Sequence, residues 1–405
     1  MNTISIALSF IEVIPFSVAI VFLILTTTLL LEVLLASVFN KPQTRKMKLD
    51  DKHSLAVIVP AHNESSGIAP VLQNIQAQLR QEDRLLVVAD NCTDDTADIA
   101  RSLGATVVER QDTQRRGKGY ALDFGLSVLS KSPPDVVVMM DADCYVSDGS
   151  LQDLASETIA TGRPTQAIYL FKSPNSSNVK DLISTFAIKL KNKIRPLGFL
   201  RLGLPSLLFG TGMAFPWSVF HEVDLANGHI VEDMKLGFDL SIAGYPPLLC
   251  PGVKVMGELP EAQQATVSQR TRWEHGHLQV LQTYVPRLFW QGIKQNRITL
   301  FLQALDLSIP PLSLLVALWI VAFSGTLILT FMGLSATSLV CMLVSGLFLF
   351  LAISVAWLRF AQDELPLSNI LSIFWYIFSK IPLYLKFLKK PQSKWVRTER
   401  SISKH

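Results

Sequence analysis

The sequence predicts an α/β domain built around a mostly parallel sheet and joined to membrane-spanning helices. The chain of 405 residues is 49% hydrophobic and only 17% charged, and its mean hydropathy of +0.33 is higher than soluble domains usually show. One stretch near each end carries no charged residue over a length that can cross a bilayer. Between them, short apolar runs alternate with segments of helical periodicity. Together these observations predict a large domain attached to a membrane.

The charge-free stretches predict three membrane-spanning helices. Residues 13–31 include no charged side chain, and about 20 apolar residues make a helix long enough to cross about 30 Å of hydrocarbon. No Lys or Arg precedes this run, which distinguishes it from a secretory signal peptide. Residues 307–358 are also free of charge and are long enough for two crossings, with a turn near residues 333–338. One crossing therefore precedes the central domain and two follow it.

Basic residues next to the spans predict the orientation. Lys and Arg close to the end of a span stay on the cytoplasmic side, and here they follow the first span and the last pair. They are Lys41, Arg45, Lys46, Lys48 and Lys52, then Arg359, Lys386, Lys389, Lys390, Lys394, Arg397 and Arg400. This predicts a multi-pass protein of the inner (plasma) membrane whose central domain and tail are cytoplasmic. The net charge of +4 lies beside the membrane, where it suits anionic membrane lipids, and no nucleic-acid partner is expected.

Four units follow from this layout. Residues 1–40 hold an N-terminal membrane helix, 41–297 a cytoplasmic domain, 298–362 an interfacial helix and two membrane helices, and 363–405 a second interfacial helix with a basic tail. Residues 370–388 are apolar enough for a fourth crossing, but Lys380 and Lys386 favour a helix that lies in the membrane interface.

The four cysteines form no close pair, which predicts reduced thiols with neither a disulfide framework nor a zinc site.

Polar residues directly follow the apolar runs of the central domain. The runs that we interpret as strands are residues 55–60, 85–90, 106–109 and 136–141. Ligands bind at the carboxyl ends of parallel strands, so the residues at those ends are candidates for a site. They are Pro60, Ala61, His62, Asn63 and Glu64 after the first run, Asp90 and Asn91 at the second, and Asp141 and Asp143 at the fourth. We expect all of them to meet at one edge of the sheet.

Two carboxylates and one lysine predict a site for a metal and a diphosphate. Asp141 and Asp143 stand two apart at a strand end, so their side chains point the same way and repel each other unless a cation lies between them. Hard divalent ions bound by carboxylate and phosphate oxygens meet that need. Lys118 lies between two glycines, which lets the backbone approach a ligand, and its ammonium can meet phosphate charge. Each pattern also has a plain structural interpretation, as a capped turn or as a solvated helix start.

Two further motifs supply groups suited to deprotonating a hydroxyl or to binding a sugar. Glu232 and Asp233 open a stretch of helical character, where a carboxylate is either a favourable partner of the helix dipole or a base that deprotonates a hydroxyl. Gln269, Arg272 and Trp273 combine hydrogen-bond donors, a cation and a broad aromatic face. Such a set either binds a sugar or anchors a helix at the membrane interface. No dinucleotide-binding fingerprint or phosphate-binding P-loop motif occurs in the sequence.

Taken in order, these motifs resemble those of the family 2 glycosyltransferases, the GT-A fold group that includes bacterial cellulose, hyaluronan and poly-N-acetylglucosamine synthases. The resemblance covers about residues 55–285 and the arrangement of the spans. It implies a nucleotide-sugar site at Pro60, Ala61, Asn63, Glu64, Asp90, Lys118 and Asp141, and a divalent metal, Mg²⁺ or Mn²⁺, at Asp141 and Asp143. Asp233 matches the family's general base. The acceptor and the departing diphosphate are implied to meet Gly210, Thr211, Gly212, Glu232, Gln269, Arg272 and Trp273.

The resemblance implies an inverting hexosyltransferase. It would move a sugar from a nucleotide-sugar to a growing polysaccharide in exopolysaccharide biosynthesis. The donor that this family usually uses is a UDP-sugar, and accessory synthase or export subunits are implied as possible partners. The motif formed by Gln269, Arg272 and Trp273 is associated with processive members, whereas the small number of C-terminal spans favours transfer of one sugar to a membrane lipid. A third hypothesis is a non-catalytic subunit that binds a nucleotide-sugar and regulates a synthase. The complete set of expected carboxylates argues against it.

Overall fold

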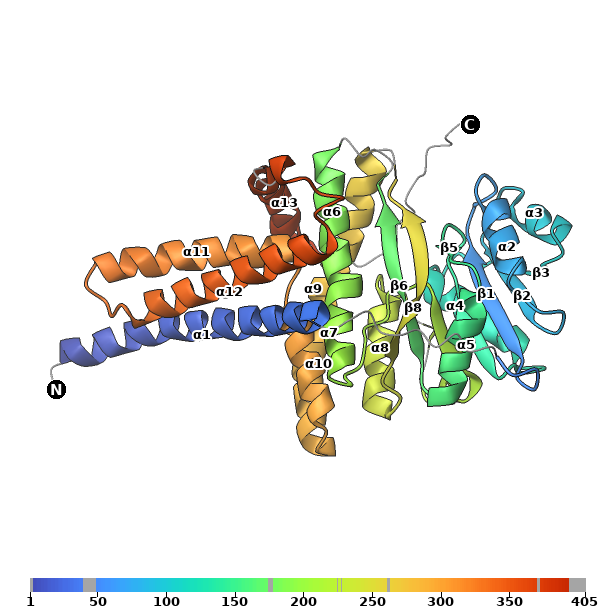
Figure 1. Ribbon diagram of the computed structural model, residues 1–405, viewed down its shortest axis with the longest axis horizontal. Coiled ribbons are helices and arrows are strands. Elements are labelled where there is room, and N and C mark those ends of the chain that lie inside the picture. Colours follow the sequence, from blue (N-terminus) through green and yellow to red (C-terminus); the bar gives the residue numbers. More distant parts are fainter. Residues whose placement is uncertain are drawn as a thin grey trace.

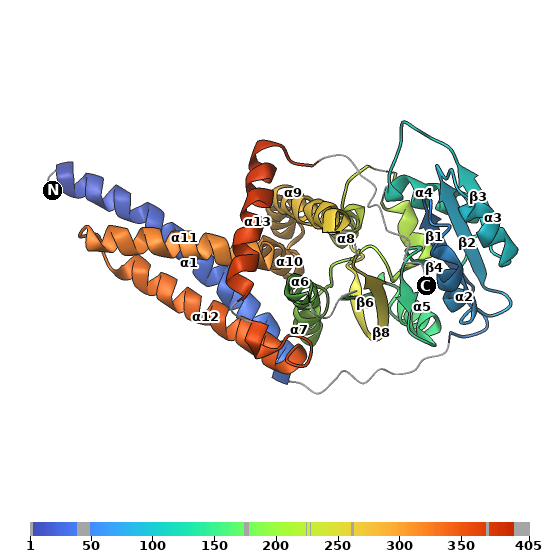
Figure 2. The ribbon, with the colours of Figure 1, turned by 90° about the horizontal axis from the view of Figure 1, so that it is seen from above.

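The sheet and three long apolar helices form opposite ends of the molecule. The computed structural model describes residues 3–38, 49–173, 178–223, 225–226, 228–260, 263–369 and 372–392. Three long helices, α1 (Thr3–Val38), α11 (Leu312–Phe331) and α12 (Thr337–Phe360), project together from one end, and the sheet lies at the other (Figure 1). The view from above shows the same two parts (Figure 2). Of the basic flanking residues, those between 39 and 48 and beyond 392 lie outside the described residues.

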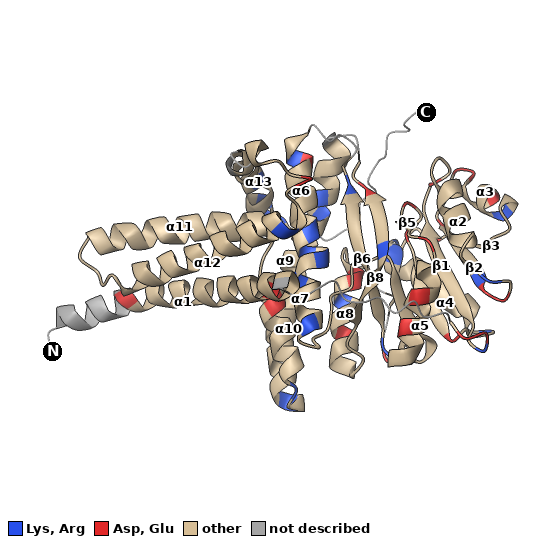
Figure 3. Ribbon diagram, in the orientation of Figure 1, with Lys and Arg blue, Asp and Glu red and all other residues tan. Residues whose placement is uncertain are grey.

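The three long helices correspond to the charge-free stretches of the sequence. Their apolar segments run over Glu12–Ser37, Leu312–Phe331 and Thr337–Phe360, and each is long and apolar enough to cross a membrane. Their outer surface is apolar as well, since Val321 and Phe350 are 70% and 66% exposed, which only a non-aqueous surrounding makes favourable. Figure 3 shows α11 and α12 almost without charged residues. The turn between them, residues 332–336, falls at the predicted place.

Helix α13 (Ser372–Lys389) lies across the three projecting helices rather than along them (Figure 2). It exposes large apolar side chains, with Trp375 at 78% and Leu388 at 77%, and it carries Lys386 and Lys389 in its last turn. Aromatic and aliphatic side chains next to lysines are typical of a helix at a membrane surface. This arrangement favours the interfacial interpretation of this segment, which stays a prediction.

An eight-stranded sheet carries the central domain, in the order β3-β2-β1-β4-β7-β6-β8-β5. Its strands are β1 (Leu55–Ala61), β2 (Arg84–Asp90), β3 (Thr106–Arg110), β4 (Val136–Met139), β5 (Tyr145–Val146), β6 (Thr165–Lys172), β7 (Met213–Pro216) and β8 (Leu248–Glu258). Parallel pairs join β1 to β2 and β4, β2 to β3, and β6 to β8. Only β7 and β5 run antiparallel to their neighbours. The predicted mostly parallel α/β sheet is confirmed.

Helices cover both faces of the sheet, as a parallel sheet requires. They are α2 (Ile68–Gln76), α3 (Thr96–Ser102), α4 (Lys118–Leu129), α5 (Ser150–Thr161), α6 (Val179–Lys189), α7 (Arg195–Arg201), α8 (Glu232–Ala243), α9 (Gln263–Gln295) and α10 (Ile298–Ser308). Alternate residues of β1 point to opposite faces, so Val57 packs with Leu72 of α2 while Ile58 packs with Leu122 of α4. The first three strands are each followed by a helix, which places their carboxyl ends at one edge.

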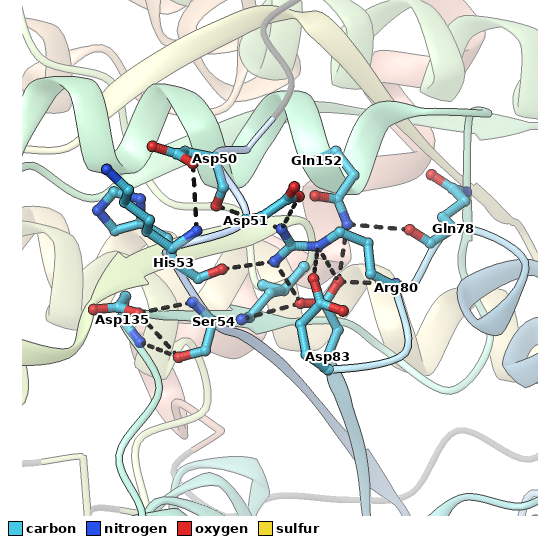
Figure 4. Close-up of polar contacts among 12 residues, drawn as sticks. Asp50, Asp51, His53, Ser54, Gln78, Arg80, Asp83, Asp135 and Gln152 are labelled. Carbon is cyan, nitrogen blue, oxygen red and sulfur yellow. Dashed lines mark hydrogen bonds and ion pairs between the residues drawn. The ribbon is translucent and has the colours of Figure 1, made fainter.

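A polar network fixes the opposite edge of the sheet (Figure 4). The Arg80 guanidinium donates to the two carboxylate oxygens of Asp83 at 2.9 and 3.1 Å and to the carbonyl of His53 at 2.6 Å. Asp83 also accepts a hydrogen bond of 3.0 Å from Gln152 of α5. These contacts tie α5 to the segments that precede β1 and β2, away from the edge where ligands bind in such folds.

A buried ion pair joins the membrane helix α1 to the domain. Arg195 donates through Nε to Glu32 of α1 at 2.7 Å and through Nη2 to the backbone carbonyl of Asp306 in α10 at 2.7 Å, and it also pairs with the Asp306 carboxylate. All three side chains are buried. Close by, Gly198 lies so near α1 that a Cβ atom there would be 2.1 Å from the Glu32 carbonyl oxygen. Helix α7 therefore packs directly on the backbone of α1.

Candidate active site

A cavity of about 240 Å³ lies at the carboxyl ends of β1, β2 and β4 and brings together most of the predicted site residues. These are Pro60, Ala61, Glu64, Asp90, Lys118, Asp141, Asp143, Gly210, Glu232, Asp233, Gln269, Arg272 and Trp273. We call it the donor cavity. His62 and Asn91, which follow β1 and β2, also line it, as do Tyr169 and Phe209. The sequence analysis did not single out Tyr169, because it belongs to no polar motif.

Three predicted residues stand behind the wall of the donor cavity instead of lining it. Asn63 has a φ of 55° and its side chain bonds to Thr93, accepting from the backbone N–H at 2.7 Å and donating to Oγ1 at 3.1 Å. Thr211 is fully buried, and its hydroxyl oxygen accepts the Asp141 backbone N–H at 3.0 Å. Gly212 has a φ of 63°, and a Cβ there would lie 2.7 Å from Val255. They shape the loops that carry the lining residues.

Asp90 is held in position by a partner from the neighbouring strand. Its carboxylate accepts from Arg110 Nη1 at 2.6 Å and from Asn91 Nδ2 at 3.0 Å. The backbone carbonyl of Asp90 lies 2.6 Å from Nδ1 of His62. Arg110 was not predicted, although it pairs with Asp90 in the register of β2 and β3. The charge-assisted bond to Arg110 leaves the other carboxylate oxygen of Asp90 available at the cavity.

Asp141 and Asp143 lie in a turn, not in a strand. The prediction that they share one face of a strand is wrong, because β4 ends at Met139 and the Cys144 N–H bonds back to the Asp141 carbonyl at 3.3 Å. The turn nevertheless brings ligand atoms of Asp141, Asp143 and Cys144 within 4.8 Å of one another. Burial raises the pKa of the Cys144 thiol to about 12, so it stays protonated. The two carboxylates remain as hard oxygen ligands, and they fit a divalent metal that also binds phosphate oxygens.

Lys118 begins α4 directly after Gly117, whose φ of 137° is favourable only for glycine. Its ammonium pairs with Asp141 and donates to the Gly210 carbonyl at 2.7 Å. Burial opposes the charged form, but the neighbouring carboxylates of Asp141 and Glu232 outweigh it and raise the pKa of Lys118. A charged ammonium therefore lies beside Asp141, one of the two carboxylates that fit a divalent metal.

Glu232 and Asp233 form a carboxylate pair at the start of α8. Burial, reinforced by the charge of Asp233, raises the pKa of Glu232 to about 7. Burial also raises the pKa of Asp233, against the opposing charges of Lys118 and Lys191. A Cβ at Gly210 would lie 3.3 Å from Asp233 Oδ2, so glycine leaves room there for a small ligand group. A carboxylate with a raised pKa is a stronger base at neutral pH than an exposed one.

Helix α9 supplies the wall opposite the metal carboxylates. Arg272 and Trp273 follow Gln269 by three and four residues, which places both next to Gln269 on the helix surface, and all three line the donor cavity. Gln269 is only 5% exposed, and its Oε1 has no hydrogen-bond partner among the described residues, which indicates a ligand donor. The Trp273 ring lies 5.2 Å from that of Phe171, which in turn lies 4.5 Å from Tyr169. The sequence analysis missed this aromatic row beyond Trp273; Tyr169 and Trp273 line the donor cavity, and the ring of Phe171 contacts both.

A second cavity of about 210 Å³ adjoins the first. Both are lined by Tyr169, Phe209, Val231, Asp233 and Trp273. From these shared residues the second cavity continues toward α1, α11, α12 and α13. We call it the membrane-side cavity. Asp233 thus lies where two cavities meet.

The comparison with known proteins places the chain in a family. Residues 53–276, more than half of the chain, match the family model described as glycosyltransferase like family 2. The chain belongs to glycosyltransferase family 2. The resemblance stated from the sequence is therefore confirmed, and with it the glycosyltransferase class of enzyme. The family match covers β1 to β8 and the first turns of α9, and so includes every predicted site residue.

Two curated relatives align with the chain over similar lengths. A probable glycosyltransferase, YdaM, of Bacillus subtilis is 24% identical over 276 residues, which is 64% of this chain and 63% of that protein. Poly-beta-1,6-N-acetyl-D-glucosamine synthase of Staphylococcus aureus is 22% identical over 266 residues, or 63% of this chain and 61% of that protein. The chain thus spans less than two thirds of the length of either relative.

A solved structure confirms the GT-A fold of this family member. The mannosyltransferase from Pyrobaculum calidifontis, in complex with GDP-Man and Mn²⁺, superposes with a TM-score of 0.50 at 17% sequence identity. The superposition covers 92% of this chain and 98% of that one, so it extends beyond the sheet into the helices that follow it. The likeness is one of fold.

Proposed function

We propose that this family 2 member is a metal-dependent, inverting glycosyltransferase that moves a sugar from a nucleotide-sugar to an acceptor arriving from the membrane. The observation that carries the proposal is the position of Asp233, which lines both the donor cavity and the membrane-side cavity. A base placed there can meet a hydroxyl from one side while the sugar lies on the other.

On the donor side, Asp141 and Asp143 hold a divalent metal, Mg²⁺ or Mn²⁺, which supplies positive charge to the diphosphate when bound. Lys118 adds a fixed cation at the same place, since Asp141 and the Gly210 carbonyl keep its ammonium at the cavity. Both stabilise the charge that grows on the departing diphosphate. The mannosyltransferase of similar fold was solved with Mn²⁺ and GDP-Man, so both UDP- and GDP-sugars are donors to test.

On the acceptor side, Asp233 takes the proton of the acceptor hydroxyl as its oxygen attacks the anomeric carbon. The bond from that carbon to the diphosphate oxygen breaks on the opposite side, and the nucleoside diphosphate leaves with the electron pair. One displacement inverts the configuration, and no nucleophile from the protein is needed. The raised pKa of Asp233 makes it a suitable base near neutral pH.

The geometry favours a membrane lipid as the acceptor. The membrane-side cavity joins Asp233 to apolar residues of the membrane helices, a route that a lipid can follow. Polysaccharide synthesis is the second candidate, supported by Gln269, Arg272 and Trp273 and by the poly-N-acetylglucosamine synthase among the relatives. We further propose that the protein is multi-pass in the inner membrane with the site on the cytoplasmic face, where nucleotide-sugars are made.

The test uses the purified full chain in detergent with added membrane lipids. It is incubated with UDP- and GDP-sugars and with Mn²⁺ or Mg²⁺, and release of nucleoside diphosphate and the labelled product are followed. We expect Asp233→Asn to lower turnover by about 10²- to 10⁴-fold while nucleotide binding persists. Product extracted into organic solvent supports the lipid, and long water-soluble product supports the polymer. Turnover that survives Asp233→Asn refutes the base, and bound nucleotide without turnover for any donor favours the regulatory subunit.

A further inference from the structure

The membrane-side cavity is apolar where it meets the membrane helices. Its lining there includes Leu29 of α1, Leu312 and Val316 of α11, Ile353 of α12 and Ile373 of α13. A sugar chain would need hydrogen-bonding side chains along such a path, whereas a hydrocarbon chain packs favourably against aliphatic side chains. These five residues come from four helices, so the cavity lies where the membrane helices meet the domain. Figure 3 shows Lys and Arg gathered on α6 and α7, between those helices and the sheet.

Most charged side chains of this cavity already have partners of opposite charge. Arg195 pairs with Glu32 and Asp306. Arg270 pairs with Asp181 at 2.8 Å, and Lys380 pairs with Glu274. The two charged lining residues that take part in no ion pair among the described residues are Lys191 and Asp233. Because Asp233 is the proposed base, Lys191 is the cation for which the protein supplies no dedicated carboxylate.

Lys191 owes its position to a local change of helix type. Residues Leu190–Ile194 form a π-helical turn between α6 and α7, and such turns are frequent at functional sites. Lys191 points into the cavity, where the thioether sulfur of Met234, at 3.9 Å, is the partner of its ammonium. Lys193, two residues on, lies outside the lining, with its ammonium 5.8 Å from the Phe360 ring centroid. Burial lowers the pKa of Lys191, partly offset by the charge of Asp233.

Two further polar groups of the membrane-side cavity lack a hydrogen-bond partner among the described residues. Nε2 of His277 has none although the side chain is only 5% exposed, and Nε of Arg270 has none either. Both residues line the same cavity and belong to α9, where Arg270 lies three residues before Trp273 and His277 lies four residues after it. Buried polar atoms without partners are rare in folded proteins and point to an absent ligand or water. Both atoms share this cavity with Lys191.

We propose that the membrane-side cavity binds the acceptor as a lipid whose headgroup carries a phosphate, and that Lys191, with His277 and Arg270, binds that phosphate. The inference rests on the proposed function and names the class of its acceptor. Three parts of the cavity match three parts of such a lipid. Aliphatic residues of the membrane helices receive the hydrocarbon, Lys191 receives the phosphate, and Asp233 receives a hydroxyl that lies beyond the phosphate.

The reaction balances with this lipid. The hydroxyl proton goes to Asp233, the hydroxyl oxygen bonds to the anomeric carbon of the donor sugar, and the nucleoside diphosphate leaves. The lipid phosphate forms and breaks no bond, so its contact with Lys191 serves binding and position. A phosphate that itself attacked would carry no proton for Asp233 to remove, which is why the hydroxyl lies beyond it.

Four small probes separate the parts of this lipid. Dioctanoyl phosphatidylglycerol has chains, phosphate and a hydroxyl beyond the phosphate, and dioctanoyl phosphatidic acid lacks that hydroxyl. Dioctanoylglycerol lacks the phosphate, and glycerol phosphate lacks the chains. Each is titrated into the detergent-solubilised full chain while tryptophan fluorescence is followed, since Trp273 lines the cavity. We expect both phospholipids to bind at least about 10-fold more tightly than dioctanoylglycerol, because a hydrogen-bonded ion pair contributes at least that much.

Three variants test whether Lys191 binds the lipid phosphate. Lys191→Met should reduce phospholipid affinity to that of dioctanoylglycerol, Lys191→Arg should preserve most of it, and Lys193→Met is the matched control that should change nothing. Lys191→Met should also raise, not lower, the unfolding temperature without lipid, because it removes a buried charge that has no paired carboxylate. A structural role for Lys191 predicts the opposite shift.

The proposal fails if the phospholipids bind no better than dioctanoylglycerol, or if Lys191→Met leaves their affinity unchanged. Glycerol phosphate binding as tightly as phosphatidylglycerol would also overturn it, since the site would then serve a free phosphate compound. Donor turnover, measured on the same preparation, separates this failure from that of the proposed function. If donor turnover depends on Asp233 but lipid binding shows no preference for phosphate, only the lipid assignment is refuted. If lipid binding depends on Lys191 but no donor is turned over, the lipid site is retained and the transferase proposal is refuted.

Discussion

Removing the Arg195 side chain should destabilise the joint between the membrane helix and the domain. In Arg195→Met the carboxylates of Glu32 and Asp306, both buried, lose the guanidinium that pairs with them. Breaking a buried ion pair by removing one partner costs about 3–5 kcal/mol, because the remaining charge stays desolvated. At about 2–4 °C for each kcal/mol, we expect the unfolding temperature to fall by roughly 6–20 °C.

The assay is thermal unfolding of the detergent-solubilised protein, followed by tryptophan fluorescence. The matched comparison replaces the whole group, as Glu32→Gln, Arg195→Met and Asp306→Asn in one chain. Because replacing all members of a buried charge group removes the desolvation cost as well, this triple variant should recover most of the stability that Arg195→Met alone loses. An unfolding temperature of Arg195→Met equal to that of the unchanged protein would show that the pair is already solvated and would refute the reasoning.

Three further outcomes follow from the site and the fold. The transfer rate should fall as the pH drops below about 7, because the pair Glu232 and Asp233 then takes up a proton. Glu232→Gln removes the like charge that favours protonation of Asp233, so it should move this acidic limb of the pH–rate profile to lower pH. An unmoved limb in the pH–rate profile would exclude the pair as its source. Asp143→Asn should weaken metal-dependent binding of the nucleoside diphosphate at least about 10-fold in calorimetry, and equal binding with and without metal in both proteins would contradict the metal site. Gly198→Ala should cost about 1–3 kcal/mol in thermal unfolding, since its Cβ would lie 2.1 Å from a carbonyl oxygen of α1, whereas Gly67→Ala, with nothing within 4 Å, should not.

The donor side of the site could be predicted because it depends on local order along the chain. Each parallel strand ends at the same edge, so a polar residue after a strand lies near the next one without further information. Asp90 and Asp141 were found in this way, and Lys118 was found from the two glycines that flank it. Arg110 was not, because its pairing with Asp90 depends on the register of β2 and β3, which the sequence does not reveal.

The membrane side could not be predicted because it depends on contacts between distant segments. Glu32 directly follows the charge-free run and looks like the polar end of a span, yet it pairs with Arg195, more than a hundred residues later. Lys191 stands in a stretch with several basic residues and looks like part of a solvated helix face. Its burial requires the π-helical turn and the packing of the membrane helices around it. Neither has a signal in local propensity.

The helical segment that joins the domain to α1 through Arg195 also carries Lys191, the residue proposed to bind the acceptor. Arg195 lies one π-turn after Lys191 and lines the same cavity. Its ion pairs with α1 and α10 hold the end of that turn in place. The donor cavity is built from strand ends and from α4, α8 and α9, all within the family's own domain. The membrane-side cavity is lined by that domain together with α1, α11, α12 and α13, so under the proposed function these helices form part of the acceptor site as well as an anchor.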